Sequence, residues 1–565
     1  MAKRCQTSIT KTQTTPSGDT WHSSIPKGDE FESVATQITL TCCHADILFR
    51  IHLNIQREDV YQWTSLEDKI SVTVECGTGR DMVTIRSHRR PFCSGTPHRS
   101  MSTFIPARTT SQTIFPMAKS NHVLSLKLSL TLLSLLIVAA TTNGLDTPSS
   151  KTWRPWPFKK LNKPVVLMIS SDGFRFGYQF KTDTPNIELL ISEGTEAKLG
   201  LIPVFPTMTF PNHYAIATGL YPAYHGIIMN KFTDPISGEV FNKGLDPKWW
   251  LGEPLWVTAT NQGRKALTYF WPGSEVPKDS WTCPKELCPH FNLSVPFEER
   301  VDTILNQFDL PEEDIPDLMM LYFNEPDGAG HSYGPDDPRV TKAVATIDKM
   351  IGRIIQGLKK REIFDEVHVI LLGDHGMVTN CDLKTIYIED LADWVKIPAD
   401  WINAYSPVLA MNPRWGEDVK NPGEKNAELV AKMNEALSSG KVENGEFLKV
   451  YLKEKLPKRL HYSESSRIPP IIGMVGEGLV VRQNRTGVHE CYGDHGYDNA
   501  YFSMRSIFMG HGPRFRKGKK VPSFENIQIY NVVAEILGLR PASNNGSSLF
   551  TRNILSPFGE TVEVE

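Results

Sequence analysis

The sequence lacks an excess of charge of either sign. Its 61 Lys and Arg residues nearly balance 64 Asp and Glu residues, which leaves a formal net charge of −3. Proteins that bind nucleic acid or anionic membrane surfaces through general electrostatic attraction carry an excess of positive charge. The composition therefore gives no argument for either partner.

The sequence also lacks a hydrophobic run that clearly reaches the length of a membrane span. The leucine-rich run Leu128–Ala140 has 13 residues without a charge, whereas a spanning helix needs about 20. Basic residues near Met117 precede this run and small, polar residues follow it, which is the pattern of a secretory signal. We interpret residues 117–144 as a signal peptide and residues 145–162 as a linker. A retained type II signal anchor and a buried core helix are the alternatives.

Residues 1–116 have little sustained periodicity. They contain five of the nine cysteines and many Ser, Thr and Arg residues. Because the signal pattern begins at Met117, we hypothesise that translation starts there and that residues 1–116 are a disordered or spurious extension. N-terminal sequencing of the secreted protein tests this, since any peptide from 1–116 would contradict it.

Cysteine is scarce after the signal, where only Cys283, Cys288, Cys381 and Cys491 remain. An even number in an oxidising compartment predicts two disulfides. Pairing of Cys283 with Cys288 would close a small loop, and pairing of Cys381 with Cys491 a long one, although three pairings are possible. Zinc binding by thiolates is the alternative, but Cys283 and Cys288 lack a second matching pair.

Three sequons make Asn292, Asn484 and Asn545 candidate N-glycosylation sites. Together with the signal and the cysteines they predict the secretory route. The expected destination is extracellular or cell wall, vacuolar, or another endomembrane compartment.

Segments with the patterns of strands and helices alternate from Pro164 to about Leu539. Helices are predicted at residues 186–193, 297–307, 340–360 and 427–437. This alternation favours an α/β fold with a mainly parallel central sheet and helices on both faces. Because no internal repeat or second linker follows, we expect one catalytic domain over 163–560. Long loops should be inserted above the strand ends, among them residues 230–281.

Three aspartates follow short apolar runs that are typical of buried parallel strands. The runs are Val165–Ser171 before Asp172, Leu318–Phe323 before Asp327, and Val367–Gly373 before Asp374. Open α/β sheets bind ligands beyond the carboxyl ends of their strands. The three ends therefore predict one shared, anionic, metal-binding crevice, although a single aspartate after a strand most often caps the next helix.

Histidines accompany these aspartates. His331 stands four residues after Asp327, His375 directly follows Asp374, and His495 lies in a Gly-Asp-His-Gly segment. Mixed Asp and His ligands suit Zn²⁺, and two metal ions about 4 Å apart can clamp both oxygens of a phosphoryl transfer. The residues therefore fit a two-metal site of this kind, although one histidine in a loop is usually only a polar surface group.

The segment Phe205–His213 holds the candidate nucleophile. Pro206 and Pro211 restrict its backbone. Taken alone it is a proline-bounded turn, in which Thr207 or Thr209 could simply cap a helix.

Several segments occur in one characteristic order. They are Ser171–Gly173, Phe205–His213, His225–Ile228, Phe270–Ser274, Glu325–Pro335, Asp374–Met377 and His495–Gly496. From about Lys163 to Leu539 the chain thereby resembles the ectonucleotide pyrophosphatase/phosphodiesterases of the alkaline phosphatase superfamily, and a plant member in particular.

The resemblance implies zinc-dependent hydrolysis of nucleotide pyrophosphate and phosphodiester bonds, as in nucleoside triphosphates, dinucleotides and nucleotide sugars. Thr209 would be the nucleophile and form a covalent intermediate, and Asn230 would donate hydrogen bonds to the phosphate oxygens. Release of a nucleoside 5′-monophosphate would follow. One zinc would be bound by Asp172, Thr209, Asp374 and His375, and the other by Asp327, His331 and His495.

Five positions match the family's nucleotide pocket. Phe210, Phe291 and Tyr322 would stack on the base, and Trp271 and Glu275 would line the rim. Aromatic residues in such positions are more often core residues than binding platforms.

One departure concerns Met208, where animal nucleotide-hydrolysing relatives carry a lysine. It weakens the case for tight polyphosphate recognition and leaves room for nucleotide sugars or dinucleotides. The alternatives are a choline-phosphodiester phosphodiesterase, whose aromatic residues would cage a quaternary ammonium, and a catalytically silent nucleotide-binding glycoprotein. We expect a small-molecule substrate, no nucleic acid beyond the ends of oligonucleotides, and a membrane contact only if 128–140 is kept as an anchor.

Overall fold

The computed structural model describes residues 161–381, 384–485 and 491–557, together with five strands within residues 6–86. The chain divides into two compact units, Met1–Ala139 and Ala140–Glu565, and each is described by itself. The signal segment 117–144 and most of the linker 145–162 lie outside the described residues.

The described part of the first unit is an antiparallel sheet. Its strands pair in sequence order: β1 (Gln6–Lys11), β2 (Ala35–His44), β3 (Ile47–Gln56), β4 (Lys69–Cys76) and β5 (Val83–Arg86). The hypothesis that residues 1–116 are a disordered or spurious extension stays a prediction. The start of translation at Met117 stays a prediction.

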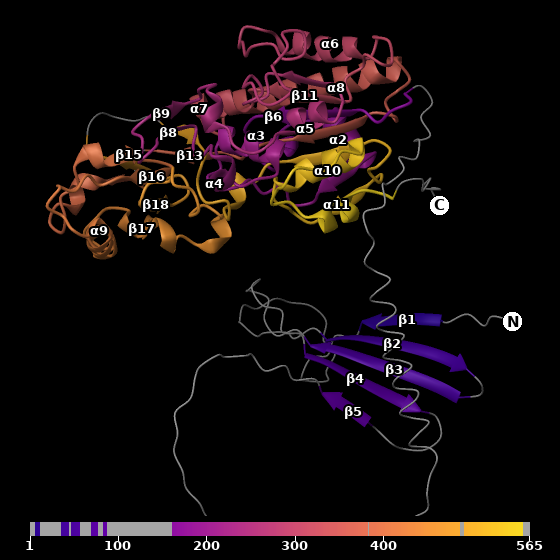
Figure 1. Cartoon of the computed structure of the whole chain (residues 1–565), viewed down its shortest axis with the longest axis horizontal. Coiled ribbons are helices and arrows are strands. Elements are labelled where there is room, and N and C mark those ends of the chain that lie inside the picture. Colours follow the sequence, from indigo (N-terminus) through magenta and orange to yellow (C-terminus); the bar gives the residue numbers. More distant parts are fainter. Residues whose placement is uncertain are drawn as a thin grey trace, which may run out of the picture. The chain divides into compact units, whose positions relative to one another are not determined.

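The second unit is built on a seven-stranded sheet (Figure 1). In order across the sheet the strands are β10 (Ala266–Tyr269), β11 (Leu318–Phe323), β6 (Val166–Ser171), β12 (His368–Leu372), β21 (Phe508–His511), β7 (Thr195–Ala197) and β22 (Lys519–Val521). Only β21 runs antiparallel to its neighbours. The predicted mainly parallel sheet is therefore confirmed.

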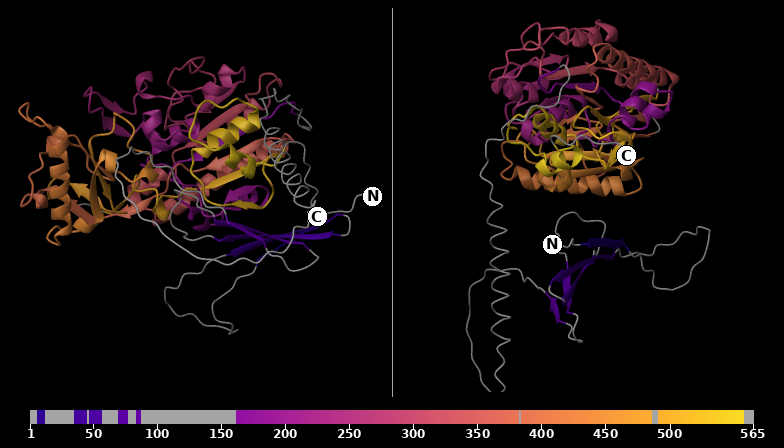
Figure 2. Two further views of the ribbon diagram at one scale, coloured as in Figure 1. Left: turned by 60° about the horizontal axis from the view of Figure 1, so that its bottom comes forward. Right: turned by 90° about the vertical axis from the view of Figure 1, so that its right-hand side faces the viewer.

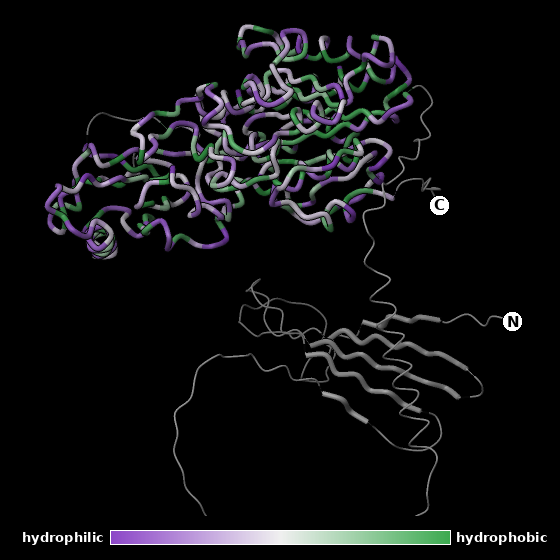
Figure 3. Tube along the Cα trace, viewed as in Figure 1, coloured by the Kyte–Doolittle hydropathy of each residue, from purple (hydrophilic) through white to green (hydrophobic). Residues whose placement is uncertain are grey.

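The central strands are buried on both faces, which explains their continuous apolar sequences. Val166 and Met168 of β6 belong to one core cluster, whereas Leu167 and Ile169 belong to the other. The first face is covered by α3 (Thr209–Thr218), α5 (Leu255–Asn261), α10 (Gln528–Leu537) and α11 (Ser548–Ile554), and the second by α2 (Pro185–Ser192), α6 (Phe297–Gln307) and α8 (Pro338–Lys360). Figure 3 shows hydrophobic residues along these central strands.

Helix α8 shows how the sequence sets the element bounds. Asp337 caps its N-terminus by accepting a hydrogen bond from the Arg339 N–H, and Pro338 occupies the first helical position. Two lysines lie in the last turn, where positive charge is favourable. The predicted helices at 186–193, 297–307 and 340–360 are confirmed within two residues.

A second, four-stranded sheet is inserted between β12 and β21. It comprises β15 (Ile402–Ala404), β16 (Val408–Met411), β18 (Ile471–Val475) and β17 (Leu448–Leu452), and α9 (Pro422–Ser438) packs against it. This orange part of the ribbon lies at one side of the second unit in Figures 1 and 2. The expected insertion above the strand ends is thus a small layered lobe with its own core.

Short paired strands complete the surroundings of the sheet. They are β8 (Lys231–Thr233) with β9 (Val240–Asn242), β13 (Val378–Asn380) with β20 (Tyr492–Asp494), and β14 (Thr385–Tyr387) with β19 (Val480–Arg482). The expected loop system over 230–281 is wrong in part, because it contains the β8–β9 hairpin, α5 and the edge strand β10. All four residues of β10 are buried, but a run this short gives only a weak sequence signal.

Candidate active site

The three predicted aspartates lie at the carboxyl ends of three adjacent strands. Asp172 follows β6, Asp374 lies two residues after β12, and Asp327 begins α7 (Asp327–Tyr333) after β11. Strand β6 pairs in parallel with both β11 and β12. The three ends therefore open at the same edge of the sheet.

The backbone brings Asp172 and Asp327 into direct contact. The Asp172 N–H donates to the Phe323 carbonyl at 2.9 Å, and the Asp327 N–H donates to the Asp172 carbonyl at 3.0 Å. Gly173 has a φ of +63°, and a Cβ atom there would lie 2.9 Å from the Asp327 Cα. Glycine at this position is what allows the two carboxylates to approach each other.

One cluster of possible ligand atoms consists of two buried residues and one partly buried residue. Asp172, Asp327 and His375 offer atoms that all lie within 4.8 Å of one another. The His375 Nε2 is 3.2 Å from Asp172 Oδ1 and 3.1 Å from Asp374 Oδ2. Asp374 therefore adjoins this cluster, which we call the inner cluster.

A second cluster, the outer cluster, consists of Asp327, His331 and His495. Asp327 Oδ1 lies 3.4 Å from His331 Nε2 and 3.5 Å from His495 Nε2, and these two nitrogens are 3.0 Å apart. The side chain of His331 is 43% exposed, so this cluster reaches solvent. Asp327 belongs to both clusters, whereas the sequence assigns it to one metal only.

Three carboxylate oxygens at the site have the character of cation ligands. Asp172 Oδ1, Asp327 Oδ1 and Asp374 Oδ2 are buried and accept no hydrogen bond from any described residue. The other oxygens of Asp172 and Asp374 accept hydrogen bonds from the Tyr322 hydroxyl and the Gly173 N–H. Buried polar atoms without partners are rare in folded proteins, and a divalent cation would satisfy all three.

The histidines are oriented as metal ligands usually are. The Nδ1 atoms of His331, His375 and His495 each lie 2.9 Å from a backbone carbonyl oxygen. A hydrogen bond to Nδ1 fixes the tautomer and leaves Nε2 as the ligand atom. The three Nε2 atoms face the carboxylates, and this mixture of carboxylates and imidazoles suits zinc.

The charges of the site are unevenly distributed when no metal is bound. Burial alone would lower the pKa of the His375 imidazole, but the negative charge of Asp374 and the contact with Asp172 raise it to about 10. Burial, followed by the charge of Asp172, raises the pKa of Asp327 well above its usual range. Burial opposes ionisation of Asp172 as well, yet the His375 imidazole, whose Nε2 lies 3.2 Å from Asp172 Oδ1, holds the pKa of Asp172 below the usual range.

Thr209 lies beside the inner cluster at the start of α3. Its hydroxyl oxygen is 3.2 Å from His375 Nε2, and the residue is 9% exposed. The Phe210 N–H, in the same helical turn, donates to the Asn230 Oδ1 at 2.9 Å. The N-terminus of a helix favours a bound anion because its N–H groups point outward. The structure thus brings Thr209 and Asn230 together with the predicted ligands.

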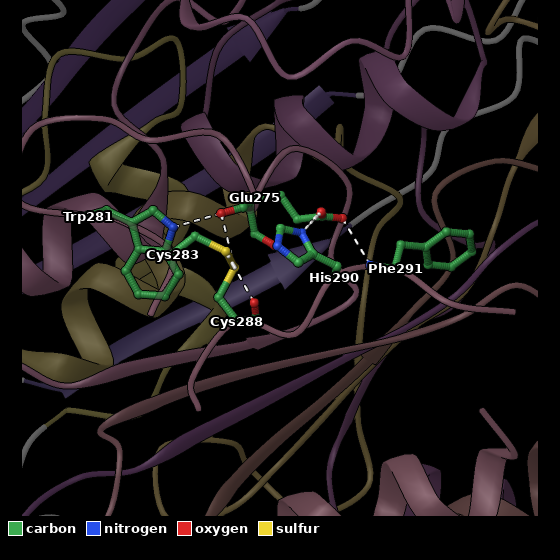
Figure 4. The surroundings of a disulfide bond; sticks show 7 residues. Glu275, Trp281, Cys283, Cys288, His290 and Phe291 are labelled. Carbon is green, nitrogen blue, oxygen red and sulfur yellow. Dashed lines mark hydrogen bonds and ion pairs between the residues drawn. A yellow bond between two sulfur atoms is a disulfide. The ribbon is translucent and has the colours of Figure 1, made fainter. Parts of the chain in front are cut away.

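The predicted pocket residues divide into exposed and buried ones. Phe291 is 45% exposed, its N–H donates to Glu275 Oε1 at 3.1 Å, and His290 pairs with the other Glu275 oxygen (Figure 4). Phe210 is half-buried. Trp271 is fully buried and its indole N–H donates to the His213 carbonyl, so it lies behind His213 rather than on the rim.

Tyr322 is placed differently from the expected base-stacking position. It is 7% exposed, and its hydroxyl donates to Asp172 Oδ2. Its ring meets the Phe291 ring edge-on, with centroids 6.0 Å apart. Tyr322 therefore contacts a candidate metal ligand.

One residue of the site was not assigned a role from the sequence. His213 is fully buried on α3, with its Nδ1 2.9 Å from the Thr209 carbonyl oxygen and 3.2 Å from Asp374 Oδ2. Its Nε2 shares a hydrogen bond with the Ser170 hydroxyl. The signal was present, because a histidine four residues after Thr209 lies one helical turn away on the same face.

Both disulfides form in the pairing that was considered from the sequence, Cys283–Cys288 and Cys381–Cys491. The zinc–thiolate alternative is therefore wrong for these cysteines. Cys381 and Cys491 directly adjoin the β13–β20 ladder, and His495 follows β20. The asparagines of the three sequons, Asn292, Asn484 and Asn545, are all exposed.

The sheet, its two layers of helices and the Asp/His clusters beside Thr209 define an α/β protein with a candidate hydrolase site. The model of the type I phosphodiesterase / nucleotide pyrophosphatase family matches residues 166–498, and the chain belongs to this family. The predicted membership of the ectonucleotide pyrophosphatase/phosphodiesterases is thereby confirmed.

Named relatives show the range of the family. Venom phosphodiesterase 2 of Crotalus adamanteus is 39% identical over 406 residues, 70% of this chain and 48% of the relative. Ectonucleotide pyrophosphatase/phosphodiesterase family member 3 of Bos taurus is 37% identical over 436 residues, 75% of this chain and 48% of the relative. The chain thus spans about half the length of these curated relatives.

A solved structure is similar over its whole length. An inactive threonine-to-alanine variant of murine ectonucleotide pyrophosphatase/phosphodiesterase 5, in complex with AMP, is 31% identical with a TM-score of 0.61. The match covers 70% of this chain and all of that one. Within the part of the chain that the structure describes, we find no helix with the length and apolar character of a membrane span; the segment 128–140 lies outside that part.

Proposed function

We propose that the chain hydrolyses phosphodiester and pyrophosphate bonds of nucleotides with the help of two zinc ions. Thr209 is the nucleophile, and the product is a nucleoside 5′-monophosphate. The observation that carries the proposal is the convergence of three buried, hydrogen-bond-free carboxylate oxygens beside the Thr209 hydroxyl at the start of α3. Family membership and the AMP complex of the mouse relative support it.

The two clusters would hold the two ions. The inner ion would be bound by Asp172, Thr209, Asp374 and His375, and the outer ion by Asp327, His331 and His495, with Asp327 also facing the inner cluster. When bound, the ions supply Lewis acidity, which lowers the pKa of a coordinated hydroxyl and neutralises charge on the phosphate.

The protein side chains then carry out a two-step displacement. The Thr209 hydroxyl gives up its proton to solvent, its oxygen attacks the phosphorus, a bond between them forms, and the bond to the leaving group breaks. Water next displaces the threonine from phosphorus, and Thr209 regains its hydroxyl. Asn230 and the N-terminus of α3 stabilise the negative charge that develops on the phosphate oxygens. The inactive threonine-to-alanine variant of the mouse relative supports an essential threonine in this family.

Phe210 and Phe291 are proposed to stack on the nucleoside base. The half-exposed Phe291 is held through its backbone by Glu275, and the Cys283–Cys288 disulfide closes the preceding loop (Figure 4). Stacking of a base on an aromatic ring is worth about 1–3 kcal/mol and tolerates any base. The pocket therefore fits a range of nucleotides, including nucleotide sugars and dinucleotides.

We also propose that the chain follows the secretory route. The two disulfides and the three exposed sequon asparagines support an oxidising compartment and glycosylation. Secreted venom phosphodiesterases among the relatives are in line with this route.

The test compares two chromogenic esters with the full chain expressed through a secretory pathway. We expect rapid hydrolysis of the p-nitrophenyl ester of thymidine 5′-monophosphate, loss of activity with a chelator, and recovery with zinc. Faster hydrolysis of p-nitrophenyl phosphorylcholine would instead assign the aromatic pocket to a quaternary ammonium. Absence of activity on both esters in a zinc-loaded, folded protein would overturn the proposal in favour of a silent binding protein.

A further inference from the structure

Tyr322 is an aromatic residue whose polar end lies at the site. It is the fifth residue of β11 and is paired with Ser170 of β6. Its 7% exposure leaves little ring surface for a ligand, in contrast to the 45% of Phe291. A buried tyrosine hydroxyl normally needs a hydrogen-bond partner, and here that partner is Asp172 Oδ2.

The hydrogen bond makes the two oxygens of Asp172 unequal. Oδ2 is occupied by the Tyr322 hydroxyl, whereas Oδ1 is buried, accepts no hydrogen bond from a described residue, and lies 3.2 Å from His375 Nε2. Oδ1 is thus the oxygen for which no described hydrogen bond competes with a cation. A carboxylate that is fixed in this way binds through one oxygen and in one orientation.

The ring of Tyr322 is held by a second residue of the site. The His213 ring packs edge-on against it with centroids 5.2 Å apart. His213 in turn contacts the Thr209 carbonyl and Asp374. Tyr322 and His213 therefore connect Asp172 with the helix that carries Thr209, and displacement of the ring would disturb both.

We propose that Tyr322 is a positioning residue: its hydroxyl orients Asp172 as a single-oxygen metal ligand, and its ring is not a platform for the base. The proposal deepens the proposed function and depends on the metal site described there. It differs from the sequence-based expectation that Tyr322 stacks on the base with Phe210 and Phe291.

The substitution Tyr322→Phe separates the two roles because it keeps the ring and removes only the hydroxyl. We expect zinc affinity, measured by competition with a chromogenic chelator, to fall about 10–100-fold. At limiting zinc the kcat should fall with it, while the KM for the thymidine ester stays unchanged. A base platform would predict the opposite, namely wild-type zinc affinity and wild-type kcat.

Two further variants of the full chain serve as controls. Tyr530→Phe removes another buried tyrosine hydroxyl, which bonds Thr258 and the Ala542 N–H and touches no residue of the site. It should retain wild-type zinc affinity even if it is less stable. Phe291→Leu should raise KM about 5–160-fold, the range expected for loss of a stacked base, and leave zinc affinity unchanged.

The outcomes distinguish this inference from the proposed function. Wild-type zinc affinity in a folded Tyr322→Phe variant overturns the inference, while an active wild type leaves the proposed function in place. If Tyr322→Phe fails to fold, Phe291→Leu is the deciding variant. An unchanged KM would mean that Phe291 does not stack on the base; the stacking role would then be assigned to Tyr322, and the inference would be overturned. A wild-type protein that binds no zinc overturns both.

Discussion

Substitution of Asp327 by asparagine should have opposite effects on stability with and without metal. Asp327 Oδ1 is buried without a hydrogen bond from a described residue, and the carboxylates of Asp172 and Asp374 lie close by. Burial and these charges raise its pKa well above the usual range, so the ionised form is unfavourable in the metal-free protein. Asparagine has nearly the same shape but carries no charge.

The size of the effect follows from the burial of this one oxygen. A buried polar group without a partner costs about 1–3 kcal/mol, and a charged one costs more. Asparagine keeps the buried oxygen and removes only the charge. We therefore expect metal-free Asp327→Asn to be more stable than the wild type by the difference between these two costs, about 1–3 kcal/mol. With an unfolding entropy of about 2 cal/mol/K per residue over roughly 400 residues, this raises the melting temperature by about 1–4 °C.

Zinc should make the wild type more stable than Asp327→Asn, the reverse of the order expected without metal. At a free concentration 100 times Kd, a ligand that binds only the folded state adds about 2.7 kcal/mol of stability. The wild type should gain this amount at each occupied position, whereas Asp327→Asn loses a ligand that both clusters share and should gain little.

The assay is thermal unfolding with chelator and with excess zinc, with Asp317→Asn as the matched control. Asp317 is also buried, but it accepts hydrogen bonds from Arg264 and from the Lys265 N–H. Loss of its charge should therefore destabilise the protein in both conditions. If Asp327→Asn without metal is destabilised as much as Asp317→Asn, the argument from the unpartnered oxygen is refuted.

Two further predictions concern the nucleophile and the response to acid. Thr209→Ala should lower turnover of the thymidine ester by at least about 10³-fold, since loss of a nucleophile removes the covalent route. Zinc content by elemental analysis should stay near that of the wild type, and retained turnover would end the assignment of Thr209. For acid, burial lowers the pKa of both His225 and His368 to about 3, whereas each titrates near 6.5 in the unfolded chain. The unfolded chain therefore binds more protons between these values, and stability, complete above pH 6.5, should fall with decreasing pH by about 1.4 kcal/mol per pH unit for each histidine. Urea unfolding from pH 8 to 4.5 measures this slope, and a flat profile below pH 6 would contradict it.

The central sheet and its aspartates could be predicted because their signals are local. Strands β6, β11 and β12 are buried on both faces, so each appears in the sequence as an uninterrupted apolar run that ends near an aspartate. Helix α8 has its apolar residues at helical spacing because one side of it packs on the sheet. The three strand ends lie far apart in the sequence, so no local pattern shows which of their side chains share a metal ion. The resemblance to a known family was needed to assign the ligand sets.

Other features could not be read from the sequence for physical reasons. Strands β7, β10 and β22 have only three or four residues, too few for a periodic pattern to stand out. Tyr322 and Trp271 each combine a large apolar ring with one polar atom, so their residue types fit a pocket wall as well as a core. For each residue one hydrogen bond decides whether it lies in a pocket wall or in the interior. Tyr322 donates to Asp172, and Trp271 donates to the His213 carbonyl.

The shared position of Asp327 makes the two proposed metal positions interdependent. Its Oδ1 lies within reach of His331 and His495 on one side, and the residue also belongs to the cluster with Asp172 and His375 on the other. Burial is the main cause of the raised pKa of Asp327, and the charge of Asp172 adds to it. A cation in either cluster would favour the ionised form of Asp327, the form that can also face the other cluster. The two clusters also differ in access, since His375 is fully buried whereas His331 is 43% exposed. An ion in the inner cluster would therefore be retained by burial, whereas an ion in the outer cluster would exchange more readily with ions in solution. Because Asp327 belongs to both clusters, occupancy of one cluster would affect the other.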